Sequence, residues 1–495
     1  MEARNIFKKC VLVVSCVLVL TIPICLIGCY HRIHERKNRV LMIALDGASW
    51  KILTPLLDEG KLPHMKYLIE NGCAGRLRTL KVGISRIIWA TIITGKSPQL
   101  HGIIGNLMVD PYTNDLIPPT TDMMKARAIW NILSERNKRV GIIGYCVDWP
   151  AEKVNGIMVS SRANGNKYSS LRDAQPPFSS FCSKKTFASF LKNPSSFPVR
   201  LPEYAAWGPD CDRFLAGVAE YVCKKNTFDF FCLYLRGIDT ISHFCWGDTS
   251  RYKDAIPEYY IWCDGVIGNL LKRFDKNTTV IILSDHGFMG ALPSREPKYF
   301  FPKVDDPFEA EGVKMFTSQE PGPAREHLKQ ALGGIQAEED GGYLFGALAD
   351  EPRGLKFFVD KACLRGSAKY HILLGGKEYD LLDAVTKIPL PGNHDVNDAV
   401  IIISGKNIRK HQRLTQASVY DIAPTLLYLS GLPVARDMQG SVLTAAVDPK
   451  FLKEEPPVYI DTYENGKKAT VQKPARSPEE EAIVKEQMRS LGYIN

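Results

Sequence analysis

The sequence predicts an α/β protein built around a mostly parallel β-sheet, and three observations indicate this class. From residue 40 onward, short apolar runs alternate with longer stretches of helical character, which is the pattern of repeated βαβ units. Acidic and imidazole side chains follow several of the short runs. The composition is that of a globular protein, with 45% hydrophobic and 24% charged residues among 495. Length alone allows two or three domains, or one large domain with insertions.

The short apolar runs are predicted to be buried strands, because each is bounded by polar or turn-forming residues. In chain order, the strands cover residues 40–45, 140–145, 155–160, 228–235, 279–284 and 399–404. The longer stretches between them predict helices at residues 62–72, 86–94, 125–136, 210–225, 256–274 and 419–430.

Two segments, residues 162–208 and 289–392, interrupt this alternation because they are rich in proline, glycine, serine and charge. The second is long enough to form a subdomain. We therefore expect a main domain of residues 40–288 and 393–495, with residues 289–392 inserted as a cap. Loops inserted at the carboxyl edge of a parallel sheet commonly shape the choice of ligand.

The N-terminal segment, residues 1–29, is predicted to target the chain to a membrane. Its apolar run at residues 10–29 follows three basic residues, as in an export signal. Leu26-Ile-Gly-Cys29 resembles a bacterial lipobox, in which Cys29 becomes the lipidated first residue. An uncleaved anchor is the second interpretation, since ~20 apolar residues cross a bilayer, and a cleaved signal peptide is the third. We favour a lipoprotein that is exported and anchored in the periplasm or cell envelope.

The formal charge of +9 does not indicate a nucleic-acid-binding protein. Residues 1–39 hold seven Lys or Arg and two acidic residues, so they contribute +5 and the remaining chain +4. More than half of the excess therefore lies in residues 1–39, and the basic flank at residues 30–39 is awkward for a translocated segment. We therefore expect a membrane as a partner and no nucleic acid, while the oligomeric state is unassigned.

The thirteen cysteines lack CxxC spacing, which excludes zinc-finger chemistry. One or two disulfides are compatible with an oxidising compartment, among Cys182, Cys211, Cys223, Cys245 and Cys263.

Side chains with metal-binding chemistry lie next to four predicted strands. Asp46 follows the first strand, whereas His394 lies on a loop before the last one. Between them, Asp239 and His243 follow strand 228–235, and Asp285 and His286 follow strand 279–284. Because ligands gather at the carboxyl ends of strands in an open parallel sheet, these side chains can converge in one crevice. Asp and His ligands suit borderline metals such as zinc.

Ser85 is the candidate nucleophile because it directly precedes the apolar helix predicted at residues 86–94. The positive end of a helix dipole favours a bound phosphate. A plain N-cap serine is the alternative interpretation, and on this feature alone it is the better one.

Taken in order, these motifs resemble the alkaline phosphatase superfamily, and within it the type I phosphodiesterase/nucleotide pyrophosphatase branch. The resemblance runs from about Val40 to the C-terminus, and it is weakest in the two interrupting segments. The motifs are Leu45-Asp-Gly47, Ser85 ten residues before Gly95, His101-Gly-Ile-Ile-Gly-Asn106, Asp239-Thr-Ile-Ser-His243, Ser284-Asp-His-Gly287, Gly392-Asn-His394 and Tyr420-Asp-Ile-Ala-Pro-Thr425. The resemblance implies a three-layer α/β/α sandwich whose catalytic domain is interrupted by the cap.

The resemblance also implies two bound zinc ions. One would be held by Asp239, His243 and His394. The other would be held by Asp46, Asp285 and His286, with Ser85 at its open position. Each cation then has mixed carboxylate and imidazole ligands and room for a reacting oxygen.

By the same resemblance, Ser85 attacks a phosphate ester and forms a phosphoseryl intermediate, while Asn106 and the amide after Ser85 donate to phosphate oxygens. Arg86 departs from the family pattern, in which a small or apolar residue often follows the nucleophile. A contact between Arg86 and a phosphate oxygen is one interpretation. We favour the other, in which Arg86 faces solvent or pairs with a carboxylate.

The leading function is therefore a two-zinc phosphodiesterase or nucleotide pyrophosphatase, which would act on a phosphate-ester substrate. A phosphomonoesterase or phospho-group transferase on the same scaffold is the alternative enzyme. The segment Ser85-Arg-Ile-Ile-Trp89 lacks the Cys/Ser-x-Pro-x-Arg pattern of sulfatases. A cofactor-independent phosphoglycerate mutase is disfavoured by the N-terminal segment. From another class, an inactive anchored binding lipoprotein is disfavoured by the intact set of metal ligands.

Overall fold

The computed structural model describes residues 39–109, 116–161, 163, 173–183, 185–186, 201, 203–290 and 391–464, and seven short strands between residues 298 and 389. The predicted anchor with Cys29 lies outside the described residues. Within the described part, no helix is long and apolar enough to cross a membrane.

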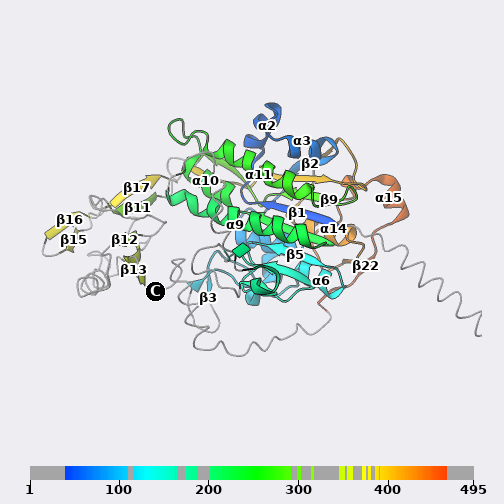
Figure 1. Cartoon of the computed structure of the whole chain (residues 1–495), viewed down its shortest axis with the longest axis horizontal. Coiled ribbons are helices and arrows are strands. Elements are labelled where there is room, and N and C mark those ends of the chain that lie inside the picture. Colours follow the sequence, from blue (N-terminus) through cyan, green and yellow to red (C-terminus); the bar gives the residue numbers. More distant parts are fainter. Residues whose placement is uncertain are drawn as a thin grey trace, which may run out of the picture.

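A nine-stranded sheet forms the centre of the molecule, with strand order β20-β2-β19-β9-β1-β8-β5-β6-β7 (Figure 1). Its strands are β1 (Val40–Leu45), β2 (Gly72–Leu77), β5 (Val140–Ile143), β6 (Gly156–Val159), β7 (Ala174–Gln175), β8 (Phe230–Leu235), β9 (Thr279–Leu283), β19 (Ala399–Ser404) and β20 (Gln412–Leu414). The block β9-β1-β8-β5-β6 is parallel throughout. β19 is antiparallel to both β9 and β2, and β7 is antiparallel to β6. The mostly parallel sheet predicted from the sequence is therefore present.

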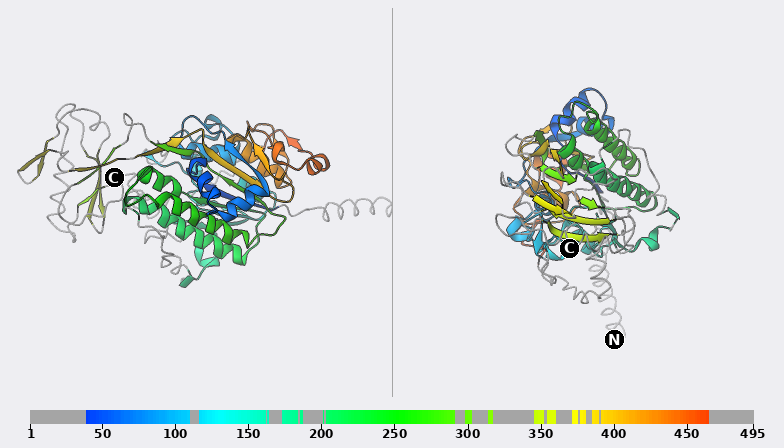
Figure 2. Two further views of the ribbon diagram at one scale, coloured as in Figure 1. Left: turned by 90° about the horizontal axis from the view of Figure 1, so that it is seen from above. Right: turned by 90° about the vertical axis from the view of Figure 1, so that its left-hand side faces the viewer.

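Helices cover both faces of this sheet because β1 is apolar on both sides. Val40, Met42 and Ala44 point into one core, and the alternating residues Leu41, Ile43 and Leu45 point into the other. The helices α4 (Ser85–Thr94), α6 (Ile129–Glu135) and α14 (Ile422–Leu429) pack on the first face. The helices α2 (Trp50–Asp58), α3 (Pro63–Glu70), α9 (Glu203–Lys225), α10 (Gly237–Cys245) and α11 (Ala255–Leu271) pack on the second. The result is a three-layer α/β/α sandwich, whose layers separate clearly in Figure 2.

Smaller elements complete the main body. They are β3 (Met108–Val109), β4 (Leu116–Ile117), β10 (Gly287–Gly290), β18 (Gly392–Asp395), β21 (Val434–Ala435), β22 (Tyr459–Ile460), α5 (Pro98–His101), α7 (Phe178–Phe181), α15 (Pro449–Glu454) and the 3₁₀ turns η1 (Thr121–Met123), η4 (Val419–Asp421) and η5 (Thr444–Ala446). Among the elements of the central sheet and its two helical layers, β2, β7, β20, α2 and α10 were not predicted.

The segment predicted to be a cap contains β11 (Lys298–Pro302), β12 (Lys314–Phe316), β13 (Phe345–Glu351), β14 (Gly354–Val359), β15 (His371–Leu374), β16 (Lys377–Asp380) and β17 (Val385–Pro389). These strands pair only with one another within the described residues, as β11-β17, β12-β14-β13 and β15-β16. These strands therefore do not extend the central sheet. The assignment of residues 289–392 as a cap subdomain stays a prediction.

The disulfides considered from the sequence are not formed. Every cysteine in the described ranges is a free thiol, including Cys182, Cys211, Cys223, Cys245 and Cys263. Burial raises the pKa of the Cys245 thiol to about 12. Thiols held neutral in this way behave as small apolar side chains of the core.

Candidate metal centre and nucleophile

The register of the central strands aligns the residues that follow them. Leu45 is paired with Leu235, and Ala44 is paired with Leu283. Asp46 and the turn that holds Asp285 and His286 therefore leave the sheet at the same edge. Since this is the carboxyl end of a parallel block, it is where a ligand crevice is expected.

Two short elements bring the other predicted ligands to this edge. Asp239 and His243 lie one helical turn apart on α10, which begins two residues after β8 ends. His394 lies on β18, where it is paired with Phe288 of the antiparallel strand β10. The placement of His394 on a loop was wrong, because the chain returns from residues 289–392 by pairing with the strand that follows His286.

A turn at Gly47 allows these elements to approach closely. Gly47 has φ +72°, and a Cβ built there would lie 2.7 Å from Phe288 Cε2 and 3.1 Å from the Asp239 Cα. Its N–H donates to Asp285 Oδ1 at 3.2 Å. Only glycine satisfies both the positive φ and the close contact, which explains the Asp46-Gly47 pair.

Five of the six predicted Asp and His ligands fall into two overlapping groups. Asp46, Asp285 and His286 form one group of ligand atoms that all lie within 4.8 Å of one another. Asp239, His286 and His394 form the other, by the same measure. His243 lies beside the second group, because its Nε2 is 3.4 Å from Asp239 Oδ1 and 2.9 Å from His394 Nε2. Geometry alone thus places His286 between the two groups, whereas the resemblance assigned it to one.

All three histidines present Nε2 to the centre of the site. Their Nδ1 atoms face backbone carbonyl oxygens, at 3.0 Å for His286 and Gly287, 3.1 Å for His243 and Gly392, and 2.7 Å for His394 and Gly83. A carbonyl only accepts, so each Nδ1 carries a proton and Nε2 is the ring nitrogen left to bind a metal. Such outer hydrogen bonds are typical of histidines that bind metals.

Ser85 lies at the same centre and is not an N-cap residue. It is the first residue of α4, Ile84 occupies the cap position, and no side chain caps the helix. The Ser85 hydroxyl is instead 3.2 Å from His286 Nε2 and 3.5 Å from Asp46 Oδ1. The alternative interpretation of Ser85 as a plain capping residue was therefore wrong.

Two aromatic residues that the sequence did not single out as site residues hold Asp46. The Tyr234 hydroxyl donates to Asp46 Oδ2, and Trp89 Nε1 donates to the same oxygen at 3.4 Å. Trp89 lies on α4, the helix that begins at Ser85. Trp89 could have been selected from the sequence, because it lies four residues after Ser85 and residues i and i+4 share one face of a helix. Tyr234 is the one polar-tipped residue in the apolar run of β8, which is a weaker signal.

Burial makes this cluster electrostatically unfavourable without a cation. Burial, with the nearby charge of Asp239, raises the pKa of Asp46 to about 6. Burial and the charges of Asp46 and Asp239 raise the pKa of Asp285 well above its usual range. Burial opposes ionisation of Asp239 too, but His243 and His394 outweigh it and hold the pKa of that carboxyl well below its usual range. Bound cations relieve such a concentration of carboxylates.

The donors present fit a pair of divalent metal ions. Asp239 Oδ1 and Asp285 Oδ2 are buried and find no hydrogen-bond partner among the described residues. The Nε2 atoms of His243 and His394 lie 2.9 Å apart, so both imidazoles present the same ring nitrogen to one point, as two ligands of one cation would. Carboxylate oxygens and imidazole nitrogens are ligands that zinc accepts.

The predicted phosphate-binding residue Asn106 lies on the segment after α5. Arg86, the residue after Ser85, donates through Nη1 to Asn106 Oδ1 and, at 3.3 Å, to the backbone oxygen of Asn106. Arg86 thus contacts the predicted phosphate-binding residue, a partner that the sequence did not suggest.

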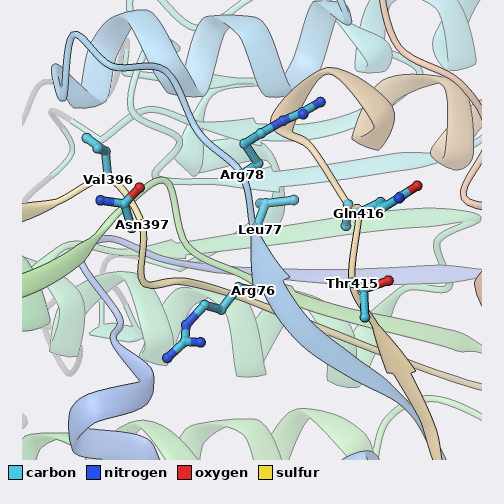
Figure 3. A pocket seen from close by; sticks show the side chains of 8 residues that line it. Arg76, Leu77, Arg78, Val396, Asn397, Thr415 and Gln416 are labelled. Atoms are coloured by element: carbon cyan, nitrogen blue, oxygen red, sulfur yellow. The ribbon is translucent and has the colours of Figure 1, made fainter.

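A surface pocket of about 520 Å³ lies between the end of β2 and the turn after β18, and none of the predicted site residues lines it (Figure 3). Arg76 Nε donates to Asp398 Oδ1 at 3.0 Å, and Figure 3 shows the Arg76 and Arg78 side chains pointing in opposite directions. These two cations therefore do not converge on one anion.

The family model for type I phosphodiesterase/nucleotide pyrophosphatase matches residues 40–340, which is more than half of the chain. The chain belongs to this family. Family membership makes the protein a metal-dependent hydrolase of phosphate esters. The match includes every predicted ligand except His394, which lies beyond it.

The solved structures that resemble this one include mammalian ectonucleotide pyrophosphatase/phosphodiesterase 5. The murine protein, solved as an inactive variant in complex with AMP, is 17% identical, with a TM-score of 0.46. The human protein is 16% identical, with a TM-score of 0.45. Each comparison covers 81% of this chain and 97% of the other. No curated protein matches the sequence.

Proposed function

We propose that this protein is a two-zinc phosphodiesterase that cleaves its substrate by nucleophilic attack from Ser85. The observation that carries the proposal is the position of the Ser85 hydroxyl, 3.2 Å from His286 Nε2 and 3.5 Å from Asp46 Oδ1. A hydroxyl at the first residue of a helix, facing predicted metal ligands, is suited to attack a phosphorus atom. Membership of the phosphodiesterase family supports the reaction class.

Asp239, His243 and His394 would hold one zinc ion, and Asp46, Asp285 and His286 would hold the other, with Ser85 Oγ at its open position. Bound there, the metals would supply charge stabilisation for the attacking and leaving oxygens. The carbonyls of Gly83, Gly287 and Gly392 would keep the three imidazoles in the tautomer that leaves Nε2 available.

The remaining residues would orient the substrate. Attack by Ser85 Oγ on phosphorus would form a P–O bond to serine and release the first alcohol or phosphate of the ester. Water would then break the bond between phosphorus and Ser85 Oγ, which restores the serine hydroxyl and releases the phosphate with its second ester group. The helix dipole of α4 and the amide of Asn106 would stabilise the negative equatorial oxygens during both steps.

We also propose that the enzyme is exported and anchored to a membrane through Cys29, and that residues 289–392 form a cap over the catalytic domain. The lipobox-like Leu26-Ile-Gly-Cys29 supports the first statement. The described strands of this segment pair only among themselves, which supports the second.

The test of the proposed reaction is Ser85→Ala compared with Ser85→Thr in the zinc-loaded protein. The alanine variant should lose several orders of magnitude in kcat on bis-p-nitrophenyl phosphate and keep its zinc content, because six ligands remain. The threonine variant keeps a hydroxyl and should retain measurable turnover. Acid quenching during turnover of bis-p-nitrophenyl phosphate should trap a p-nitrophenyl phosphodiester on Ser85. An alanine variant with most of the wild-type activity would show that metal-bound water attacks directly.

A further inference from the structure

The contact between Arg86 and Asn106 connects the candidate nucleophile to the predicted phosphate-binding residue. Arg86 is the second residue of α4, directly after Ser85. Its Nη1 donates both to the side-chain oxygen and to the backbone oxygen of Asn106, twenty residues further along the chain. One guanidinium therefore holds both the amide group and the backbone of this residue.

This contact determines which end of the Asn106 amide is available. A guanidinium has N–H donors and no acceptor, so it must face Oδ1 of the asparagine. The NH₂ end of the same amide is consequently turned away from Arg86 and can donate elsewhere. Without such a partner, an asparagine amide can rotate by half a turn and present an oxygen, which would repel a phosphate.

Asn106 has little other support. It lies between the end of α5 at His101 and the start of β3 at Met108, and its neighbours Ile104 and Leu107 are 65% and 42% exposed. Within the described ranges, Arg86 is the one hydrogen-bond partner of the Asn106 side chain. An exposed asparagine on a segment without regular structure needs such a tie to keep one orientation.

We propose that Arg86 is a positioning residue that orients Asn106, so that the amide NH₂ of Asn106 faces the phosphate beside Ser85. This inference rests on the proposed function, because it takes Asn106 as a phosphate ligand. It replaces a direct contact between Arg86 and the phosphate with an action through Asn106. The rigid first turn of α4 would then set both the nucleophile and the amide that binds the phosphate.

The test is a double-mutant cycle with Arg86→Ala, Asn106→Ala and the double variant, all loaded with zinc. We measure kcat/KM for bis-p-nitrophenyl phosphate and for p-nitrophenyl phosphate, and the affinity for inorganic phosphate by calorimetry. Each single change should lower kcat/KM for both esters by about tenfold or more, since a hydrogen bond to a charged group is involved. The double variant should be no worse than Asn106→Ala alone.

Two further variants separate positioning from a general loss of structure. Arg86→Lys keeps one donor but not the planar fork, so it should recover part of the loss. Arg78→Ala removes an exposed arginine of the segment before α4 and should change neither activity nor phosphate affinity. Losses in Arg86→Ala should occur without a change in the thermal unfolding midpoint.

Several results would overturn the inference. They are multiplicative losses in the double variant, a loss in Arg86→Ala confined to the monoester, or no loss at all. The first two would indicate direct contact between Arg86 and the phosphate. If the wild-type protein hydrolyses neither ester, the proposed function fails. The affinities of the wild-type protein and the three variants for inorganic phosphate then still decide the role of Arg86. A wild-type protein that binds no phosphate refutes the positioning role too.

Discussion

Removing the hydroxyl group of Tyr234 should weaken the metal site through Asp46. Asp46 is 3% exposed, and its Oδ2 atom accepts hydrogen bonds from Tyr234 and Trp89. The bond from Trp89 is long, at 3.4 Å, so Tyr234 is the main donor. Burial and the charge of Asp46 raise the pKa of Tyr234 well above its usual range, so the hydroxyl keeps its proton at any working pH.

The expected magnitude follows from the nature of this bond. A hydrogen bond to a charged acceptor contributes about 1.5–3 kcal/mol, and each 1.36 kcal/mol corresponds to a factor of ten. Tyr234→Phe should therefore lower zinc affinity or kcat/KM by about 10- to 150-fold. This agrees with the 10- to 100-fold typical of residues that orient a metal ligand.

The assay is zinc affinity by competition with a chelator, together with kcat/KM on bis-p-nitrophenyl phosphate. Tyr145→Phe is the matched control, because its buried hydroxyl donates at 3.0 Å to the backbone oxygen of Trp89 and, in the described part of the chain, forms no hydrogen bond with a predicted ligand. Equal effects of the two changes, or no effect of Tyr234→Phe on either quantity, would refute the reasoning.

Three further predictions concern the metal ligands, the substrate and the anchor. His394→Ala should remove about one of two bound metals by elemental analysis while the far-UV circular dichroism is unchanged; loss of both metals or of the fold contradicts this. The ratio of kcat/KM for bis-p-nitrophenyl phosphate over p-nitrophenyl phosphate should exceed one, because the neutral amide of Asn106 suits the single charge of a diester; a ratio well below one would overturn the diesterase assignment. Cys29→Ser should abolish lipidation and processing of the precursor, whereas unchanged membrane retention with residues 1–28 still attached would indicate an uncleaved anchor.

The sheet could be predicted because its strands are strongly apolar on both faces. Residues 40–45 and 399–404 were assigned with the observed bounds, since a doubly buried strand reads as a continuous apolar run. β2 was missed because Gly72-Cys-Ala-Gly-Arg-Leu77 has small and polar residues and lies at the antiparallel side of the sheet. The helix α10 was missed because its nine residues follow β8 with almost no turn between them.

The choice of ligand residues came from the sequence, whereas their mutual arrangement did not. Asp46, Asp285 and His286 could be selected because they directly follow strands whose carboxyl ends share an edge. The direction of β19, the pairing of His394 with Phe288 and the Tyr234 hydroxyl that holds Asp46 all depend on contacts between residues more than 100 positions apart. No local pattern encodes such contacts.

The sequence by itself determined the fold class, the family resemblance and the residue types available at the sheet edge, because periodicity and strand-end motifs are local properties of the chain. Only the tertiary structure decided that Ser85 faces Asp46 and His286, that three backbone carbonyls select the Nε2 lone pairs, and that Arg86 holds Asn106. These depend on side-chain directions that are set when the layers pack together, and packing is a property of the whole folded chain.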